Sequence, residues 1–523
     1  MSLRRQTFLQ GAVILLAAGV VNRLLGFVPR IALPRMIGAE GVGLIQLVYP
    51  FLIVALTVIA GGLPLAVAKL VAEAEARGDE ARVRRVLVTA LALAGGFSLA
   101  AAGVCYALSE WVAEHVMTDA RVRSPFLAML PALPVVAVSS VWRGYFQGRH
   151  NMIPSAVSQT VETLVRIALT LLFAWLFLPR GLEQAAAGAV LGTVAGEIAG
   201  LLSLWFWFRG EREPMAAAKR PMGQSAWPFG STPSVTRRLL GIAAPVTGSR
   251  MIGSLSYLLE SILTARSLAA AGVATALATA QYGALQGMIV PLLALPGALT
   301  YSLAVSLVPS LAESAARDDA AAIRKRLHQS LRLAVAAGAP FAMLMGVLAE
   351  PICALLYGQH DIAGLLRLLA PFSIFLYMQP PLQAALQALD RPGVALMNSL
   401  FGAAVKLALI VQLASDIRFG IRGAAIAMGV NMVLVTLLHW VSVARLTGLR
   451  LSPADFVKIG AGAVLAGAAA LWIWNLGALP ADALNLIAAA AAAASLYILA
   501  LVPLGVVDRH DAARLPFIGR LFR

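Results

Sequence analysis

The sequence predicts an all-α protein that crosses a membrane fourteen times. This fold class follows from the composition, the length of the apolar runs and the positions of the positive charges. Hydrophobic residues make up 60% of the 523 residues, charged residues make up only 13%, and the mean hydropathy is +0.83. A soluble domain carries about 25% charged residues, because its surface faces water. The composition therefore excludes a soluble enzyme, a secreted disulfide scaffold and a disordered protein.

The apolar runs define the expected helices in order. A spanning helix needs about 20 mostly apolar residues, and one long polar stretch rich in Pro, Gly and Ser divides the runs into two sets. We therefore predict a six-helix N-terminal lobe (1–208), a cytoplasmic linker (209–238), a six-helix C-terminal lobe (239–446), and a final helix pair with a cytoplasmic tail (447–523). The predicted spans are 8–30, 44–68, 86–108, 125–147, 156–178, 186–208, 239–265, 284–310, 329–352, 365–388, 395–414, 421–444, 457–476 and 485–505.

The positive charge sets the expected orientation. The chain has 41 Lys and Arg against 25 Asp and Glu, a net charge of +16. Most of the Lys and Arg fall in the N-terminus, in every second loop and in the C-terminal tail. Positive loops stay in the cytoplasm, so we expect a multi-pass protein of the cytoplasmic membrane with both termini inside. The loops 69–85 and 311–328 should both lie on the cytoplasmic side.

The two halves resemble each other. At an offset of 240 residues, segments 72–87 and 312–327 are identical at eight of sixteen positions, and Gln147 aligns with Gln387. Six helices per repeat insert both copies the same way up, which predicts a parallel pseudo-two-fold repeat. Two such bundles around a central cavity are typical of a transporter. Prolines within the spans, together with Gly61-Gly62 and Gly283/Gly287, predict bent helices.

Charged residues inside the spans are the candidate site residues, because burying a charge in a bilayer is costly. Arg23 and Arg30 are seven residues apart, nearly two turns, and so share a helix face. Arg250 lies at a matching depth in the seventh span. Three guanidinium groups would suit a phosphate, because each donates paired hydrogen bonds and stays charged. The alternative is that each arginine reaches the membrane surface or neutralises a carboxylate, and this reading is favoured for Arg35 and Arg266.

A second set of charges could couple or gate transport. Glu260 lies about three turns beyond Arg250 and could balance an arginine or bind a coupling cation. Glu162 and Arg166 stand at i,i+4, a spacing that favours a structural ion pair. Lys406 is the repeat counterpart of Arg166 without a local acid. Glu197 and His439 could relay protons, or could simply bond to a backbone carbonyl.

Motifs for other chemistry are missing from the sequence. The two cysteines, Cys105 and Cys353, lie far apart in apolar context, so we expect no metal and no cofactor beyond a coupling ion of unknown identity. The sequence contains no Walker loop, HExxH or GxSxG, and no nucleic-acid partner is expected because the basic residues belong to the loops. We expect a membrane transporter rather than an enzyme.

Segments 4–51, 61–74 and 295–314 resemble the stage V sporulation protein B branch of the MOP flippase superfamily. The resemblance implies fourteen helices and transport of an undecaprenyl-diphosphate-linked saccharide by a monomer among membrane lipids. The related lipid II flippases share Arg23-Leu24-Leu25-Gly26 and a second arginine that falls on Arg30. They also have an arginine near the eighth-helix Leu-Pro, where 290–296 is uncharged here, so Arg250 or Arg266 would have to replace it.

The resemblance implies a flippase for lipid II, the precursor of peptidoglycan and of spore cortex. The alternatives are a flippase for another polysaccharide precursor and a multidrug or cation antiporter of the same superfamily. An antiporter for cations should have an acidic cavity, whereas the deep charges here are mainly Arg. A membrane scaffold for cell-wall enzymes and a membrane-embedded transferase are more distant alternatives.

Overall fold

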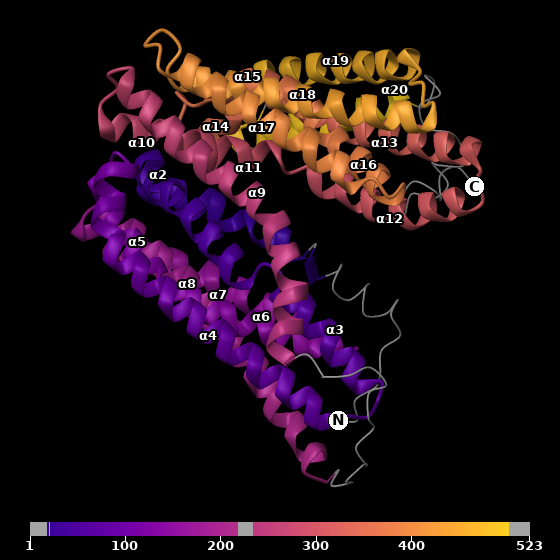
Figure 1. Cartoon of the computed structure of the whole chain (residues 1–523). Helices are drawn as coiled ribbons and strands as arrows, with labels where there is room; N and C mark the ends of the chain where they lie inside the picture. The colour runs from indigo at the N-terminus through magenta and orange to yellow at the C-terminus, as the bar shows by residue number, and fades with distance from the viewer. Residues whose placement is uncertain (1–17, 20, 218–233, 478, 502–523) are drawn as a thin grey trace. The chain divides into compact units, whose positions relative to one another are not determined.

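A computed structural model describes residues 18–19, 21–217, 234–477 and 479–501 of the chain (Figure 1). All regular secondary structure in these ranges is helical. By internal contacts the chain divides into two compact units, Met1–Ala269 with Ala274–Gly283, and Ala270–Val273 with Ala284–Arg523. The contacts thus group the seventh predicted helix, 239–265, with the first unit. The sequence assigned that helix to the C-terminal lobe because of the repeat, and the two lobes stay a prediction.

The first unit holds the helices up to Gly283. Most coincide with predicted spans, and α8 continues into the predicted linker, of which 218–233 lie outside the described residues. The elements are α2 (Phe27–Ala60), α3 (Leu63–Glu75), α4 (Glu80–Trp111), η1 (Val112–Val116), η2 (Ala120–Val122), α5 (Arg123–Met129), α6 (Ala132–Gly148), α7 (Ile153–Phe177), η3 (Leu178–Arg180), α8 (Leu182–Ala217), α9 (Val235–Ala270) and α10 (Thr275–Gly283).

The second unit holds the remaining elements. Its final helix ends at Leu501, and the predicted tail beyond it lies outside the described residues. The elements are η4 (Ala284–Ile289), α11 (Val290–Leu293), α12 (Gly297–Ala316), α13 (Ala320–Val347), α14 (Ala349–Tyr357), α15 (Ala363–Leu369), η5 (Ala370–Phe372), α16 (Ser373–Ala388), α17 (Pro392–Ala414), α18 (Ile421–Thr447), α19 (Pro453–Leu476) and α20 (Asp482–Leu501).

The number of membrane spans is counted differently in the structure. Within the described residues, 12 helical segments are long and apolar enough to cross a membrane, and the first of them, Val21–Glu75, contains the predicted span 44–68 and the end of the predicted span 8–30. The helix of this segment is broken at Gly38, where φ is 68°. The predicted count of fourteen therefore stays a prediction. The eighth span was predicted to begin at 284, but the helix at that place begins at Thr275. The prediction missed residues 275–283 because they are rich in Ala and Thr and only weakly apolar.

Glycine allows close packing between α7 and α8 in the first unit. Along α8 every fourth residue is glycine, at 188, 192, 196 and 200. At each of these positions an added Cβ would press on α7, for example on the Thr170 backbone at Gly192. Small residues at this spacing let helix backbones approach without relying on a hydrophobic driving force, which is weak between helices in lipid. The two helices therefore hold the side chains at their interface in fixed positions.

The repeat is visible in local geometry. Gly78 and Asp318, at matching positions, both have positive φ, 67° and 52°. The next residues, Asp79 and Asp319, each cap the following helix by accepting a backbone N–H three residues on, both at 2.9 Å. Such capping satisfies a helix N–H that has no intrahelical partner. The same sequence pattern thus builds the same turn twice.

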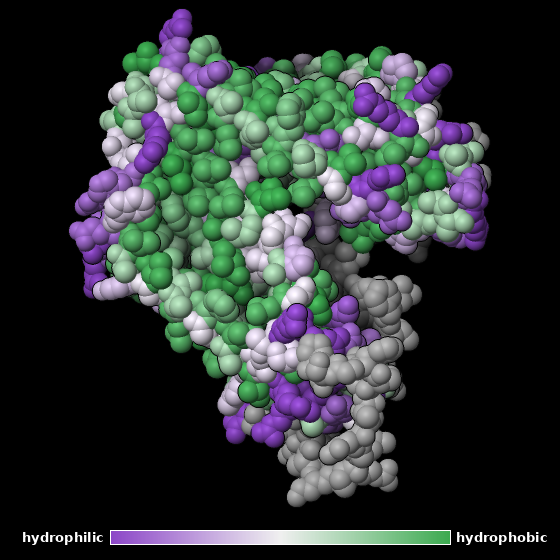
Figure 2. All heavy atoms as spheres, in the orientation of Figure 1, coloured by the Kyte–Doolittle hydropathy of each residue, from purple (hydrophilic) through white to green (hydrophobic). Residues whose placement is uncertain are grey.

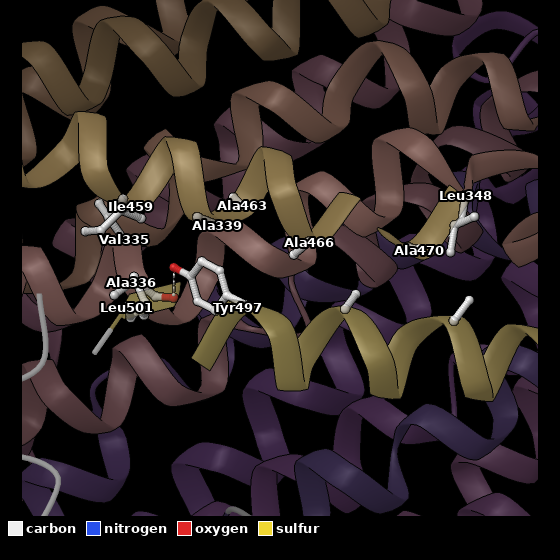
Figure 3. Close-up of a cluster of buried hydrophobic side chains, with 12 residues drawn as sticks. Val335, Ala336, Ala339, Leu348, Ile459, Ala463, Ala466, Ala470, Tyr497 and Leu501 are labelled. Carbon is white, nitrogen blue, oxygen red and sulfur yellow. Dashed lines mark hydrogen bonds between the residues drawn. The ribbon is translucent and has the colours of Figure 1, made fainter. Parts of the chain in front are cut away.

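In the second unit, α19 and α20 pack with α13 around an alanine-rich core (Figure 3). Tyr497 is buried there, and its hydroxyl donates to the Ala336 carbonyl at 2.8 Å.

Outside such cores many large apolar side chains are exposed, among them Tyr106 at 68% and Trp472 at 66%. On the face in Figure 2 the exposed apolar side chains form broad continuous areas. A soluble monomer rarely exposes such areas, whereas lipid accommodates them.

Candidate functional site

Arg23 and Arg30 lie on the first described helical segment, and both side chains are exposed. Between them the helix is interrupted only at Gly26, whose N–H still donates to the Asn22 carbonyl at 2.9 Å. The helical path therefore continues, and a seven-residue spacing leaves both guanidinium groups on one face. This agrees with the spacing argument from the sequence, while binding of an anion there stays a prediction.

Arg250 is fixed by the helix break between α2 and α3. Its Nη1 donates to the Gly61 carbonyl at 2.6 Å, and the Gly62 N–H donates to Thr247 Oγ1 at 3.0 Å. A Cβ at Gly62 would collide with the Ala243 carbonyl oxygen, so only glycine lets α9 come this close. Arg250 thus satisfies a carbonyl at the break, a structural role that the sequence did not reveal.

Arg30 and Glu260 belong to one neighbourhood in the first unit. Both lie close enough to Tyr257 for their charges to act on its hydroxyl, and Tyr49 does so as well. Glu260 is only 4% exposed and lies on the same helix as Arg250. Arg30 and Glu260 therefore share Tyr257 as a neighbour, while a role of Glu260 in balancing an arginine stays a prediction.

Glu162 and Arg166 form the expected ion pair, with Oε1 and Nη1 3.1 Å apart. Sequence reasoning missed a third member, Arg143 on α6, whose Nη2 lies 2.6 Å from Glu162 Oε2. Its signal was available, because Arg143 is a charge inside the predicted span 125–147. Glu197 on α8 lies close to all three charges. These four residues form a cluster at the α6–α7–α8 interface, which we call the four-charge cluster.

The remaining candidates are Arg266, Lys406, Arg35 and His439. Arg266 donates from Nη2 to the His115 carbonyl at 2.6 Å, which fits the structural alternative. Lys406 is half-buried on α17 in the second unit, and Arg35 is exposed on α2. His439 is fully buried, and neither ring nitrogen has a hydrogen-bond partner among the described residues. The expected bond from His439 to a backbone carbonyl is therefore not formed there.

A further polar network joins α2, η2 and α10, and no sequence pattern predicted it. Asp119 accepts from Arg121 Nη2 and from Thr279 Oγ1, both at 2.8 Å, and Arg121 Nη1 reaches Glu40 at 2.5 Å. Burial raises the pKa of Asp119, but the hydrogen bonds from Arg121 and Thr279 outweigh it and hold that pKa below its usual value. The network joins the middle of α10 to η2 and α2.

Comparison with known proteins decides the family. The sequence pattern of the polysaccharide biosynthesis protein family matches residues 8–315. The chain belongs to this family. Along its whole length this family member is 41% identical to stage V sporulation protein B of Bacillus subtilis (strain 168), over 520 residues and 99% of each chain.

Solved structures show the fold of this polysaccharide biosynthesis protein. The lipid II flippase MurJ in an inward closed conformation matches with a TM-score of 0.69 at 12% identity, over 96% of this chain and 100% of that one. An inward-facing multidrug resistance MATE transporter of the MOP superfamily matches with a TM-score of 0.62 at 14% identity, over 82% and 94%. The protein therefore has the fold of these two structures, and its apolar helices fit a multi-pass membrane protein.

Proposed function

We propose that this protein is a flippase that carries an undecaprenyl-diphosphate-linked saccharide, lipid II for peptidoglycan and spore cortex, across the cytoplasmic membrane by alternating access. The observation that carries the proposal is a pair of exposed arginines, Arg23 and Arg30, on one face of a helix within a membrane-spanning segment. Charge within a spanning segment is costly and is a candidate functional site for that reason. The similarity to stage V sporulation protein B and the MurJ-like fold support the substrate class.

The diphosphate binds to Arg23, Arg30 and Arg250 in this account. A guanidinium group donates two parallel hydrogen bonds to a phosphate and stays charged in a low dielectric. It has five N–H donors, so the bond from Arg250 to Gly61 leaves most of them for a ligand. Arg250 would then bind the substrate and the Gly61 carbonyl at the helix break at the same time.

Glu260 serves the empty site. Without substrate, the cationic side chains face one another in a poorly screened environment, and a buried carboxylate beside Arg30 lowers that repulsion. A diphosphate would replace it as the counter-charge. We propose that Glu260 is the group that exchanges partners when substrate binds. Glu162 and Arg166 belong to the four-charge cluster instead, and Lys406 on α17 remains a candidate for coupling or gating.

Binding measured by native mass spectrometry tests the site directly. Purified full-length protein is titrated with lipid II and, separately, with undecaprenyl monophosphate. We expect a preference for lipid II, and a loss of about 10- to 100-fold in affinity for Arg23→Ala or Arg30→Ala, the size of a lost hydrogen bond to a charged group. Arg180→Ala is the matched control, because Arg180 is exposed but stacks on Phe177 at a helix end.

Two results would count against the proposal. Unchanged lipid II affinity in both variants would remove the arginines from the site. Tight binding of a lipophilic cation such as tetraphenylphosphonium, lost in Glu260→Gln, would favour the cation antiporter instead, because that substrate needs an acidic rather than a basic cavity.

A further inference from the structure

The members of the four-charge cluster are held in place by helix packing. Gly196 and Gly200 of α8 lie against Glu162 and Arg166 of α7, and a Cβ at Gly196 would stand 2.6 Å from Arg166 Cβ. Glu197 follows Gly196 directly, so its carboxyl group emerges at this tight interface. The cluster has no place in the mechanism proposed above.

Both arginines of the cluster are committed to one carboxylate. Glu162 is 8% exposed and accepts from Arg143 on one oxygen and from Arg166 on the other. The remaining bonds of the arginines go to hydroxyl groups, from Arg143 Nε to Ser158 at 3.4 Å and from Arg166 Nη2 to Thr163 at 3.5 Å. None of these described bonds reaches Glu197.

Glu197 is left with an incomplete set of donors. Its carboxyl group lies close enough to that of Glu162 to form a hydrogen bond. Its Oε2 atom is buried and has no hydrogen-bond partner among the described residues. An ionised Glu197 would place negative charge on an oxygen that has no donor, beside a second carboxylate, and both effects disfavour ionisation. A neutral Glu197 removes both problems, since its O–H can donate to Glu162.

We propose that Glu197 is a proton-binding site of the first unit, in which one proton is shared between the carboxyl groups of Glu197 and Glu162. When the proton leaves, a guanidinium group must turn from Glu162 to Glu197 to supply the missing donor. Arg166 is better placed to move than Arg143, because its side chain is 32% exposed against 19%. The site therefore has two arrangements, one with both arginines on Glu162 and one with the arginines divided.

Other charges around α8 are already paired or distant. Tyr49 of α2 lies 3.4 Å from Thr193, one turn before Glu197. At the opposite end of α8, Glu183 accepts from Ser124 of α5, and Arg180 stacks on Phe177. Arg123, which begins α5, lies 3.8 Å from Glu110. The charged groups that act on Glu197 from its packed neighbours are thus Arg143 from α6 and Glu162 and Arg166 from α7.

Infrared difference spectroscopy on the purified full-length protein tests this proposal. A protonated buried carboxyl group gives a carbonyl-stretching band separate from the bands of ionised carboxylates. At neutral pH we expect the wild type to show this band and Glu197→Gln to lose it, while Glu183→Gln, on the same helix, keeps it. The measurement needs no substrate, so its outcome is independent of whether the protein moves lipid II.

A second variant tests the sharing of the arginines. In Glu162→Gln the two guanidinium groups lose their anion and turn to Glu197, which then ionises. We expect the protonated band to disappear in this variant although Glu197 is still present. A band that survives in Glu162→Gln would mean that burial alone keeps Glu197 neutral, and would overturn the shared site. A Glu197→Gln spectrum identical to the wild type at every pH would overturn proton binding itself.

Discussion

At the scale of single residues, Arg250 has two functions in this account, through different nitrogen atoms of one guanidinium group. One nitrogen bonds to the Gly61 carbonyl, and the others are free to meet the substrate in our proposal. Removal of the Arg250 side chain should therefore affect the fold as well as the substrate site.

We expect Arg250→Ala to reduce both stability and transport. The Gly61 carbonyl would lose a hydrogen bond to a charged donor, which costs about 1.5–3 kcal/mol. A thermal-shift measurement in detergent should show a lower Tm for Arg250→Ala than for the wild type. An equal Tm for the two proteins would show that the bond to Gly61 does not stabilise the fold.

At the scale of helices, the break at Gly61-Gly62 and its contact with α9 determine where Arg250 stands. The break was expected from the glycine pair, but the helix that covers it was not, because α9 is distant in sequence. The contact depends on the absence of a side chain at Gly62. Substitutions on the two helices therefore differ in their consequences.

Gly62→Val should destabilise the protein, because its side chain would collide with the Ala243 carbonyl and push α9 away. Overpacking of this kind costs about 1–3 kcal/mol. Gly241→Ala, on α9, is the control, since an added Cβ there meets nothing within 4 Å and should be neutral or stabilising. Thermal unfolding of the two variants measures the difference, and a Gly62→Val protein as stable as the wild type would contradict the close contact.

The repeat also makes a topological prediction that matched positions can test. Single cysteines at Ala76 and Ala316, which are exposed and equivalent in the repeat, should resist an impermeant thiol reagent in intact cells. Ala481→Cys, in the exposed turn before α20, should be labelled from outside. The background lacks Cys105 and Cys353. Labelling of only one of the two repeat positions from outside would reject the parallel repeat.

At the scale of the whole molecule, composition and periodicity predicted the helical class, most helix positions and the repeat, because these depend on local pattern. The pairing of Arg143 with Glu162, and of Asp119 with Thr279, could not be predicted. Each joins segments whose distance is set by packing, in the first case by the glycines of α8. The start of α10 was missed because its Ala- and Thr-rich turns are too weakly apolar to be recognised as a span.

The energy source for transport is also a property of the whole molecule. A membrane potential of about 100 mV contributes about 2.3 kcal/mol for each charge moved. An inside-negative potential favours outward movement of the anionic diphosphate, and it draws the empty cationic site back inward. We therefore expect turnover to fall when valinomycin with balanced potassium abolishes the potential. Undiminished turnover under those conditions would reject a potential-driven mechanism.

The most direct test is to measure lipid II translocation in liposomes that contain only this protein. Fluorescent lipid II in the inner leaflet is protected from dithionite, an impermeant reductant, and becomes bleachable once it is moved to the outer leaflet. We expect translocation by the wild type and by Arg180→Ala, and a loss in Arg23→Ala. Liposomes with folded wild-type protein that move lipid II no faster than empty liposomes would contradict the proposed function.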